Sequence, residues 1–146
     1  MSDSAVEEVV HECLALRVRL IGRAITSIYD TALEGHGLTI AQVNLLAALG
    51  KIGPCAPSRL GEALQIERST VSRNLALLLK REWVEVVSAD AKGLREVGLT
   101  GAGRAKVRSV LPEWRSAQEE AARLLGPAGA ASVRSVASGL GFSPGA

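Results

Sequence analysis

Apolar residues recur every three or four positions over the first quarter of the chain, the spacing of a helix with a buried face. The pattern predicts a single helix over residues 5–34, begun by a capping box of Ser4 and Glu7. About thirty residues of helix reach roughly 45 Å, which is too long to lie across one small core. Apolar positions also occupy more than one stripe of this helix. We therefore expect a second copy of the chain to cover part of it.

The middle of the chain is predicted to form three shorter helices separated by turns. Helical spacing places them over residues 39–50, 58–64 and 68–81. Thr39 and Gln42 form a capping box at the start of the first of these helices. Pro57 suits the start of the second, because its fixed φ matches the first turn of a helix. The inward face of the third carries Val71, Leu75 and Leu78.

Two short segments rich in β-branched residues follow, at residues 84–87 and 96–99. Turn-forming residues separate them, so the pair predicts a two-stranded hairpin. Helices are predicted again over residues 101–125 and 128–140, on either side of a glycine–proline pair. Thr100 is the expected cap of the first, and Pro112 is expected to kink it. The predicted fold class is mainly α with a small β-hairpin (α+β).

The composition is that of one globular domain. The chain has 146 residues, of which 47% are hydrophobic and 22% charged, values close to the average. Charged and glycine residues interrupt the apolar runs, which excludes a membrane span, and the first residues lack the features of a secretory signal. Two cysteines, Cys13 and Cys55, do not make a disulfide framework. We therefore expect a cytoplasmic protein without a membrane partner or a cofactor.

Charge is distributed unevenly, although the net charge is only +2. Residues 1–50 carry three Arg against six acidic residues, residues 51–108 carry eleven Lys or Arg against six, and residues 109–146 carry three of each. A basic middle segment suits a polyanion such as DNA. It is equally compatible with a solvated basic surface, so charge alone does not decide between the two.

The order of the predicted elements is more specific. Two helices joined by the tight turn at residues 65–67 form a helix-turn-helix, and the hairpin after them makes the unit winged. In such a unit, the N-terminal residues of the second helix reach base edges in the major groove. Side chains suited to bases or phosphates occupy that position, namely Arg68, Ser69, Thr70, Ser72, Arg73 and Asn74. The alternative is an ordinary amphipathic helix with a polar outer face.

Four segments, in matching order and spacing, resemble the MarR family of winged helix-turn-helix transcriptional regulators. They are residues 37–42, 58–64, 68–75 and 90–103. The resemblance implies a homodimer that is held by long N- and C-terminal helices and binds a pseudo-palindromic operator in double-stranded DNA. It divides the chain into an N-terminal dimerisation helix, a winged helix-turn-helix DNA-binding lobe and C-terminal dimerisation helices, at residues 1–36, 37–100 and 101–146.

The resemblance also assigns residues in the wing. Lys92 stands at the wing tip, where the family more often has an Arg that enters the minor groove, and Asp90 is the bracing acid. Arg95 can supply part of the same contact. The expected DNA contacts come from the start of the helix-turn-helix, from its second helix, called the recognition helix, and from the wing. They are Ser58, Arg68, Ser69, Thr70, Ser72, Arg73, Asn74, Lys92 and Arg95. Glu82 stands where the family often has Gly, and a left-handed backbone there would cost a non-glycine residue about 1 kcal/mol.

A small effector is a further expectation, because similar regulators bind aromatic carboxylates or phenols between the dimer helices and the DNA-binding lobe. The candidate ligand-binding side chains are Arg17, Arg23, Tyr29 and His36. One branch of the family instead senses organic peroxides through a cysteine in the first helix, which makes Cys13 a candidate redox residue. Cys13 lies about one helical turn from the position of the sensing cysteine in that branch. Tyr29 is the single tyrosine that could activate its thiol, so a structural role for Cys13 is the favoured interpretation.

The predicted function is a homodimeric, sequence-specific DNA-binding transcriptional regulator, a repressor that releases DNA when a small ligand or an oxidant acts. A dimeric interaction module without operator binding is the alternative. No phosphate-binding loop, nucleophile motif or carboxylate pair points to an enzyme. His11, Cys13 and His36 are too few ligands to predict a metal site.

Overall fold

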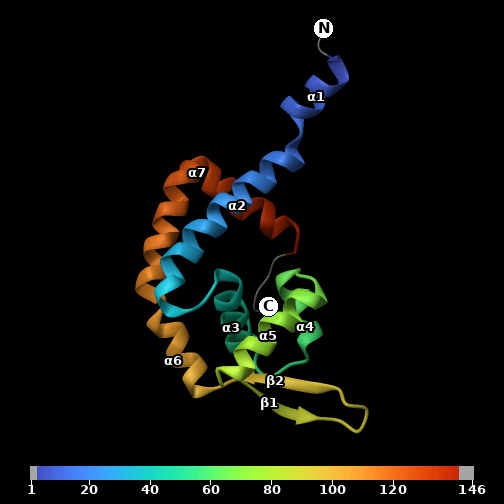
Figure 1. The fold of residues 1–146 in the computed structure, drawn as a ribbon, viewed down its shortest axis with the longest axis vertical. Coiled ribbons are helices and arrows are strands. Elements are labelled where there is room, and N and C mark those ends of the chain that lie inside the picture. The colour runs from blue at the N-terminus through green and yellow to red at the C-terminus, as the bar shows by residue number, and fades with distance from the viewer. Residues whose placement is uncertain (1–2, 142–146) are drawn as a thin grey trace.

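The computed structural model describes residues 3–141, which form helices and one two-stranded hairpin, as the α+β class predicts (Figure 1). In chain order the elements are α1 (Ser4–Glu12), α2 (Leu14–Leu33), the 3₁₀ turn η1 (Glu34–His36), α3 (Ile40–Ile52), α4 (Pro57–Leu64), α5 (Arg68–Lys80), β1 (Val84–Ala89), β2 (Arg95–Leu99), α6 (Gly101–Ser109) and α7 (Leu111–Gly139). No helix among residues 3–141 is long and apolar enough to cross a membrane. Residues 1, 2 and 142–146 of the predicted terminal domains lie outside the described residues.

The single helix predicted over residues 5–34 is wrong, because the chain is extended at Cys13 (φ −63°, ψ 108°) and α1 and α2 are separate helices. A helix end leaves carbonyl groups without partners. Here the Arg17 guanidinium donates to the carbonyl oxygens of His11 and Cys13, at 3.1 Å for Cys13. Helix α1 has no buried residue and projects away from the rest of the molecule (Figure 1).

The predicted helix caps are confirmed at two helices and wrong at one. At α3, the Thr39 hydroxyl accepts the Gln42 amide at 3.3 Å, and the Gln42 side chain accepts the Thr39 amide at 3.1 Å. At α6, the Thr100 hydroxyl accepts a first-turn amide at 2.9 Å. At α1, by contrast, the cap is Asp3, which accepts a backbone amide at 3.0 Å, and not Ser4.

The hydrophobic core lies around α3. Helices α2, α4, α5 and α6 and the strand β2 all pack against it. The predicted inner face of α5 is confirmed, since Val71, Leu75 and Leu78 are 2%, 4% and 1% exposed. The burial of these three side chains fixes which side of α5 faces outward.

The hairpin is antiparallel, with Val84 opposite Leu99, Val86 opposite Val97, and a bulge after Val86. Cys55, in the loop before α4, extends the sheet on its other side. The Cys55 amide donates to the Val97 carbonyl at 3.0 Å, and the Val97 amide donates back at 2.9 Å. The base of the wing is therefore bonded to the start of the helix-turn-helix.

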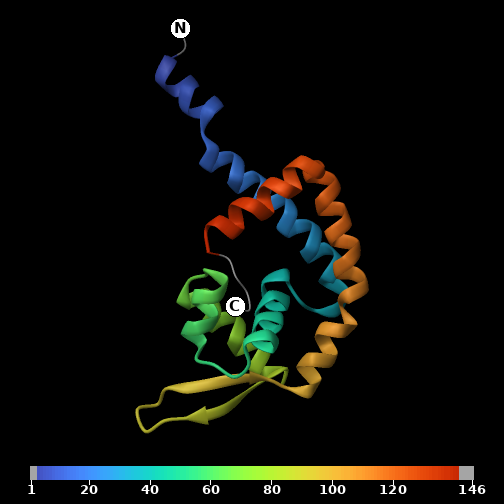
Figure 2. The ribbon, with the colours of Figure 1, turned by 180° about the vertical axis from the view of Figure 1, so that it is seen from behind.

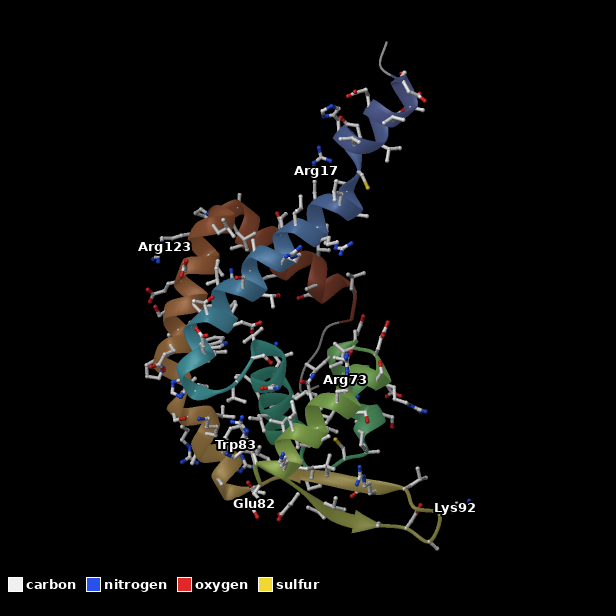
Figure 3. All side chains as sticks on the ribbon, in the orientation of Figure 1. Arg17, Arg73, Glu82, Trp83, Lys92 and Arg123 are labelled. Carbon is white, nitrogen blue, oxygen red and sulfur yellow. The ribbon has the colours of Figure 1, made fainter. Side chains whose placement is uncertain are left out.

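Trp83 lies between the end of α5 and the start of β1 (Figure 3). The Arg81 guanidinium lies 5.2 Å and the Lys106 ammonium 5.1 Å from the centre of its ring, distances typical of cation–π contacts. A Cβ atom on Gly103 would collide with the Trp83 carbonyl oxygen. Helix α6 can therefore approach this segment only because residue 103 is glycine.

Helices α6 and α7 meet at Val110 rather than at a kink centred on Pro112, which lies in the first turn of α7, where its missing amide is tolerated. Gly126 (φ 71°, ψ 165°) interrupts α7 where the glycine–proline pair predicts a break. Beyond it, α7 turns back across α2 and ends near α4 (Figure 2), where the Gln65 side-chain amide donates to the Leu140 carbonyl at 2.9 Å.

Glu82 has a φ of 60°, so it occupies the left-handed region that favours glycine. Because the Cβ atom of an L residue is strained there, we expect Glu82→Gly to raise the free energy of unfolding by about 0.5–1 kcal/mol. Chemical denaturation at fixed protein concentration measures the change. The control is Glu85→Gly, which removes a similar exposed acid from the extended strand β1 and should lower stability. A Glu82→Gly protein no more stable than the parent would contradict this interpretation.

Candidate nucleic-acid interface

The open face of α5 lies opposite its buried face. Ser69 and Arg73, one turn apart, are both exposed there. Figure 3 shows Arg73 on α5 and Lys92 at the end of the hairpin, so the two cations lie on separate parts of the lobe. An arginine on such a face presents a planar set of donors that matches the paired acceptors of a guanine edge.

A groove of about 420 Å³ lies between α4, α5 and the wing. Four of the predicted DNA-contacting residues line it together, namely Ser58, Arg68, Ser72 and Arg95. Apolar side chains such as Leu75 and Leu94 form its walls, and none of the described residues that line it is acidic. The structure thus brings two guanidinium groups and two hydroxyls to one concave surface, as a phosphate backbone requires.

The wing tip is closed by Asp90. Its carboxylate accepts the backbone amides of Lys92 and Leu94, each at 2.9 Å, and its own amide donates to the Leu94 carbonyl at 2.8 Å. Asp90 therefore braces the backbone of the turn and not the ammonium group of Lys92. The Lys92 side chain is exposed at the tip.

Thr70 and Asn74 are not on the open face of α5, contrary to the prediction for that helix. Asn74 is half-buried, with its side-chain amide donating to the Thr70 carbonyl at 3.1 Å and its oxygen accepting from Gln42 on α3 at 3.4 Å. Thr70 faces the same side and lines a groove against α3. Both side chains lie on the flank of α5 that packs toward α3. The sequence alone does not distinguish this flank from the outer face of the helix.

This second groove, of about 430 Å³, lies between α2, α3 and the turn before α5. Sequence reasoning missed it, because it joins three separate segments. Its lining is Thr26, Ile40, Ala41, Asn44, Ala47, Ala48, Lys51, Leu64, Ile66 and Thr70. The one sequence signal is a face of small residues on α3 that ends at Lys51, the single charged residue among those lining residues.

The four predicted ligand-binding side chains do not converge. The Arg17 side chain donates to backbone carbonyls at the break between α1 and α2, and Arg23 lies on the exposed surface of α2. Tyr29 donates to Gln118 of α7 and lies beside the Trp114 ring, with centroids 6.4 Å apart. His36 pairs with Glu113 of α7, with 3.0 Å between its Nε2 and the carboxylate.

The pKa values of Tyr29 and of Glu113, the partner of His36, are shifted in opposite directions. Burial raises the pKa of Tyr29, although Arg134 partly opposes that rise. Hydrogen bonds from its own backbone and from His36 hold the pKa of Glu113 below its usual value. Tyr29 and the His36–Glu113 pair thus serve as contacts between α7 and the preceding helices.

The two cysteines are free thiols. Cys13 is half-buried at the helix break, about four helical turns from Tyr29, which bonds to Gln118 instead. Cys55 is buried beneath the wing, and this burial raises the pKa of its thiol. Across residues 3–141, His, Cys, Asp and Glu side chains form no cluster of three that could hold a metal ion.

Comparisons with known proteins agree with this geometry. A model of the MarR family matches residues 36–95. The chain is similar to the M. tuberculosis transcriptional regulator MosR, with 31% identity, a TM-score of 0.73, and coverage of 90% of this chain and 94% of MosR. It is similar to BpsR of Bordetella bronchiseptica, whose DNA binding is regulated by 6-hydroxynicotinic acid (25% identity, TM-score 0.76, 88% and 94% coverage).

The fold is also that of a mutant E. coli MarR complexed with operator DNA, at 18% identity, a TM-score of 0.77, and coverage of 95% of this chain and 99% of that one. No curated protein matches the chain significantly.

Proposed function

The chain belongs to the MarR family of transcriptional regulators, and we propose that it acts as a homodimeric repressor that releases its operator when an aromatic ligand binds. Membership makes it a DNA-binding regulator and not an enzyme. The observation that carries the proposal is the outer face of α5, where Arg73 stands opposite a buried face and beside a groove lined by Arg68 and Arg95. The proposed division into units is residues 1–36 and 101–146 for dimerisation and 37–100 for DNA binding.

In this proposal, α5 enters the major groove and Arg73 reads a base. Ser69 reaches the same surface, while Ser58, Arg68, Ser72 and Arg95 hold phosphates along the groove beside the wing. Lys92 supplies charge at the wing tip. Because an ammonium group lacks the planar fork of arginine, its contribution is mostly independent of sequence. Thr70 and Asn74 are assigned no contact with bases.

We expect Arg73→Ala to weaken operator binding ten- to hundredfold, because one bidentate arginine–guanine pair is worth about 1–3 kcal/mol of discrimination. Lys92→Ala should weaken operator and scrambled DNA alike and lower the salt slope by about two per dimer. The measurement is binding at several salt concentrations to an operator selected from random-sequence duplexes.

The matched control is Arg115→Ala, which removes an exposed positive charge from α7, outside the lobe. Affinity for both duplexes should then stay close to that of the parent protein. If Arg73→Ala weakens binding to operator and scrambled DNA equally, Arg73 contacts phosphate and the base assignment fails.

The dimer is supported by apolar side chains that the protomer leaves in solvent on α1, α2 and α7. On α2, Leu14, Val18 and Ile21 are 75%, 66% and 44% exposed. The others of this set are Val6, Val9, Val10, Leu16, Leu20, Leu124, Val133 and Val136, with Leu140 directly after α7. Surfaces of this extent usually mark a protein–protein interface. A pseudo-palindromic operator requires the two-fold symmetry that such a dimer supplies.

Sedimentation equilibrium at micromolar concentration should give twice the chain mass of 15.2 kDa. Val18→Glu places a charge in the apolar stripe of α2 and should shift the mass toward one chain. Val86→Glu, on the wing, is the control, since this valine is also exposed (45%) but lies outside the stripe. A parent protein that sediments as a single chain would refute the dimer.

The ligand response is supported by the groove between α2 and α3. Its walls are mostly apolar, Thr26, Asn44 and Thr70 offer polar atoms, and Lys51 offers one positive charge. An aromatic carboxylate matches this lining, because its ring is apolar and its charge is opposite to that of lysine. The similarity to BpsR points to the same class of ligand. Lys51 thus replaces Arg17, Arg23, Tyr29 and His36 as the proposed ligand contact.

We expect 6-hydroxynicotinic acid to bind the parent protein and Lys51→Met to weaken that binding about tenfold, the loss typical of a charge-assisted hydrogen bond. Calorimetric titration measures the dissociation constant. The control is Lys80→Met, an exposed lysine at the end of α5 outside the groove. If Lys51→Met and Lys80→Met bind the acid equally, the ligand does not occupy this groove.

A further inference from the structure

Hydrogen bonds link α2 to the recognition helix α5 through the first turn of α3. Asp30 on α2 accepts the Ile40 amide at 2.8 Å, which fixes the N-terminus of α3. In the same turn, the Gln42 side chain accepts the Thr39 amide at 3.1 Å and donates to Asn74 on α5 at 3.4 Å. These bonds join three helices over a short path, although Asp30 and Asn74 are far apart in the sequence.

The direction of each bond in this link is set by backbone groups. A backbone amide can only donate, so the oxygen of the Gln42 side chain must face Thr39 and its nitrogen must face α5. A backbone carbonyl can only accept, so the nitrogen of Asn74 must face Thr70, 3.1 Å away, and its oxygen must face Gln42. Neither amide can flip without losing a bond to the backbone.

We propose that Gln42 and Asn74 are positioning residues that set the rotation of α5 and thereby aim its neighbour Arg73 at the bases. The burial of Val71, Leu75 and Leu78 fixes which side of α5 faces outward. Because the hydrophobic effect is non-directional whereas a hydrogen bond depends on angle, the amide pair sets the rotation within that range. An arginine tip lies roughly 9 Å from its helix axis, so a 10° rotation of α5 would move that tip by about 1.5 Å. Such a shift is enough to lose a bidentate contact.

The inference rests on the proposed recognition of an operator and extends it to residues that touch no DNA. The hydrogen bonds that run from Asp30 through Gln42 to Asn74 lie beside the proposed ligand groove. Thr70 and Ile40 take part in these bonds and also line the groove. A molecule in that groove would lie against the two backbone segments that orient the amide pair.

The test is Gln42→Glu. A glutamate at this position keeps the acceptor for the Thr39 amide, so the capping box survives, but it cannot donate to Asn74. We expect the ratio of operator to scrambled affinity to fall three- to tenfold while the thermal unfolding midpoint changes little. The control is Gln65→Glu, the same amide-to-acid change in the same lobe. It loses the bond to the Leu140 carbonyl but lies outside the Gln42–Asn74 contact, so it should weaken both duplexes equally and leave the ratio unchanged.

A neutral double-mutant cycle removes the effect of added charge. Gln42→Leu and Asn74→Leu should each lower the ratio, and the double variant should lower it no further than the stronger single variant, because both remove the same Gln42–Asn74 bond. Each variant also loses its own bond to the backbone, at Thr39 or at Thr70. The base preference next to Arg73 should relax in all three.

Three outcomes would overturn the inference. One is an unchanged ratio of operator to scrambled affinity in both Gln42 variants while the parent protein still selects its operator. This result would leave the proposed function intact. Another is a loss of preference at one base in Asn74→Leu alone, which would make Asn74 a base contact. The last is a parent protein that does not distinguish operator from scrambled DNA, which refutes the proposed function as well.

Discussion

Helices α2, α4, α5 and α6 and strand β2 all pack against α3. Leu45, Leu46 and Leu49 of this helix are 1%, 0% and 1% exposed, and α2, α5 and α6 meet it on different sides. A close-packed interior transmits a displacement instead of absorbing it. In the proposed dimer, a movement of α2 would therefore be passed through α3 to α5.

Helix α5 separates two grooves of similar size, and this separation bears on the proposed ligand response. The groove beside the wing carries Arg68 and Arg95, while the groove beside α3 carries Lys51. A ligand in the second groove does not have to compete with DNA for the same side chains. In the proposed function, its effect on DNA binding would pass through α5, which lines both grooves.

The local sequence is sufficient to predict a structural feature when the residues that determine the feature are neighbours in the chain. The Thr39–Gln42 box, the inner face of α5 and the Thr100 cap each depend on residues within about two turns of one another. The break at Cys13 was not predictable in this way, because neither glycine nor proline marks it. Its carbonyl groups are satisfied by a side chain further along the chain, and no core covers that part of the helix.

The candidate site was predictable to a similar extent. Arg73 and Ser69 follow from helical periodicity, and the contacts of Asp90 lie within its own turn. The flank positions of α5 depend on a partner helix: periodicity places Asn74 among the residues open to DNA, whereas in the structure Gln42 of α3 faces it. The groove at Lys51 requires three segments to be placed in space.

The chain has two tryptophans, and they lie at different joints of the molecule. Trp83 is flanked by two cations where α5, β1 and α6 meet, and Trp114 lies against Tyr29 where α7 meets α2. Indole emission depends on nearby charge and on ring contacts, so the protein carries two intrinsic optical probes. With one tryptophan replaced by phenylalanine, the emission of the other follows motion at a single joint and needs no attached dye.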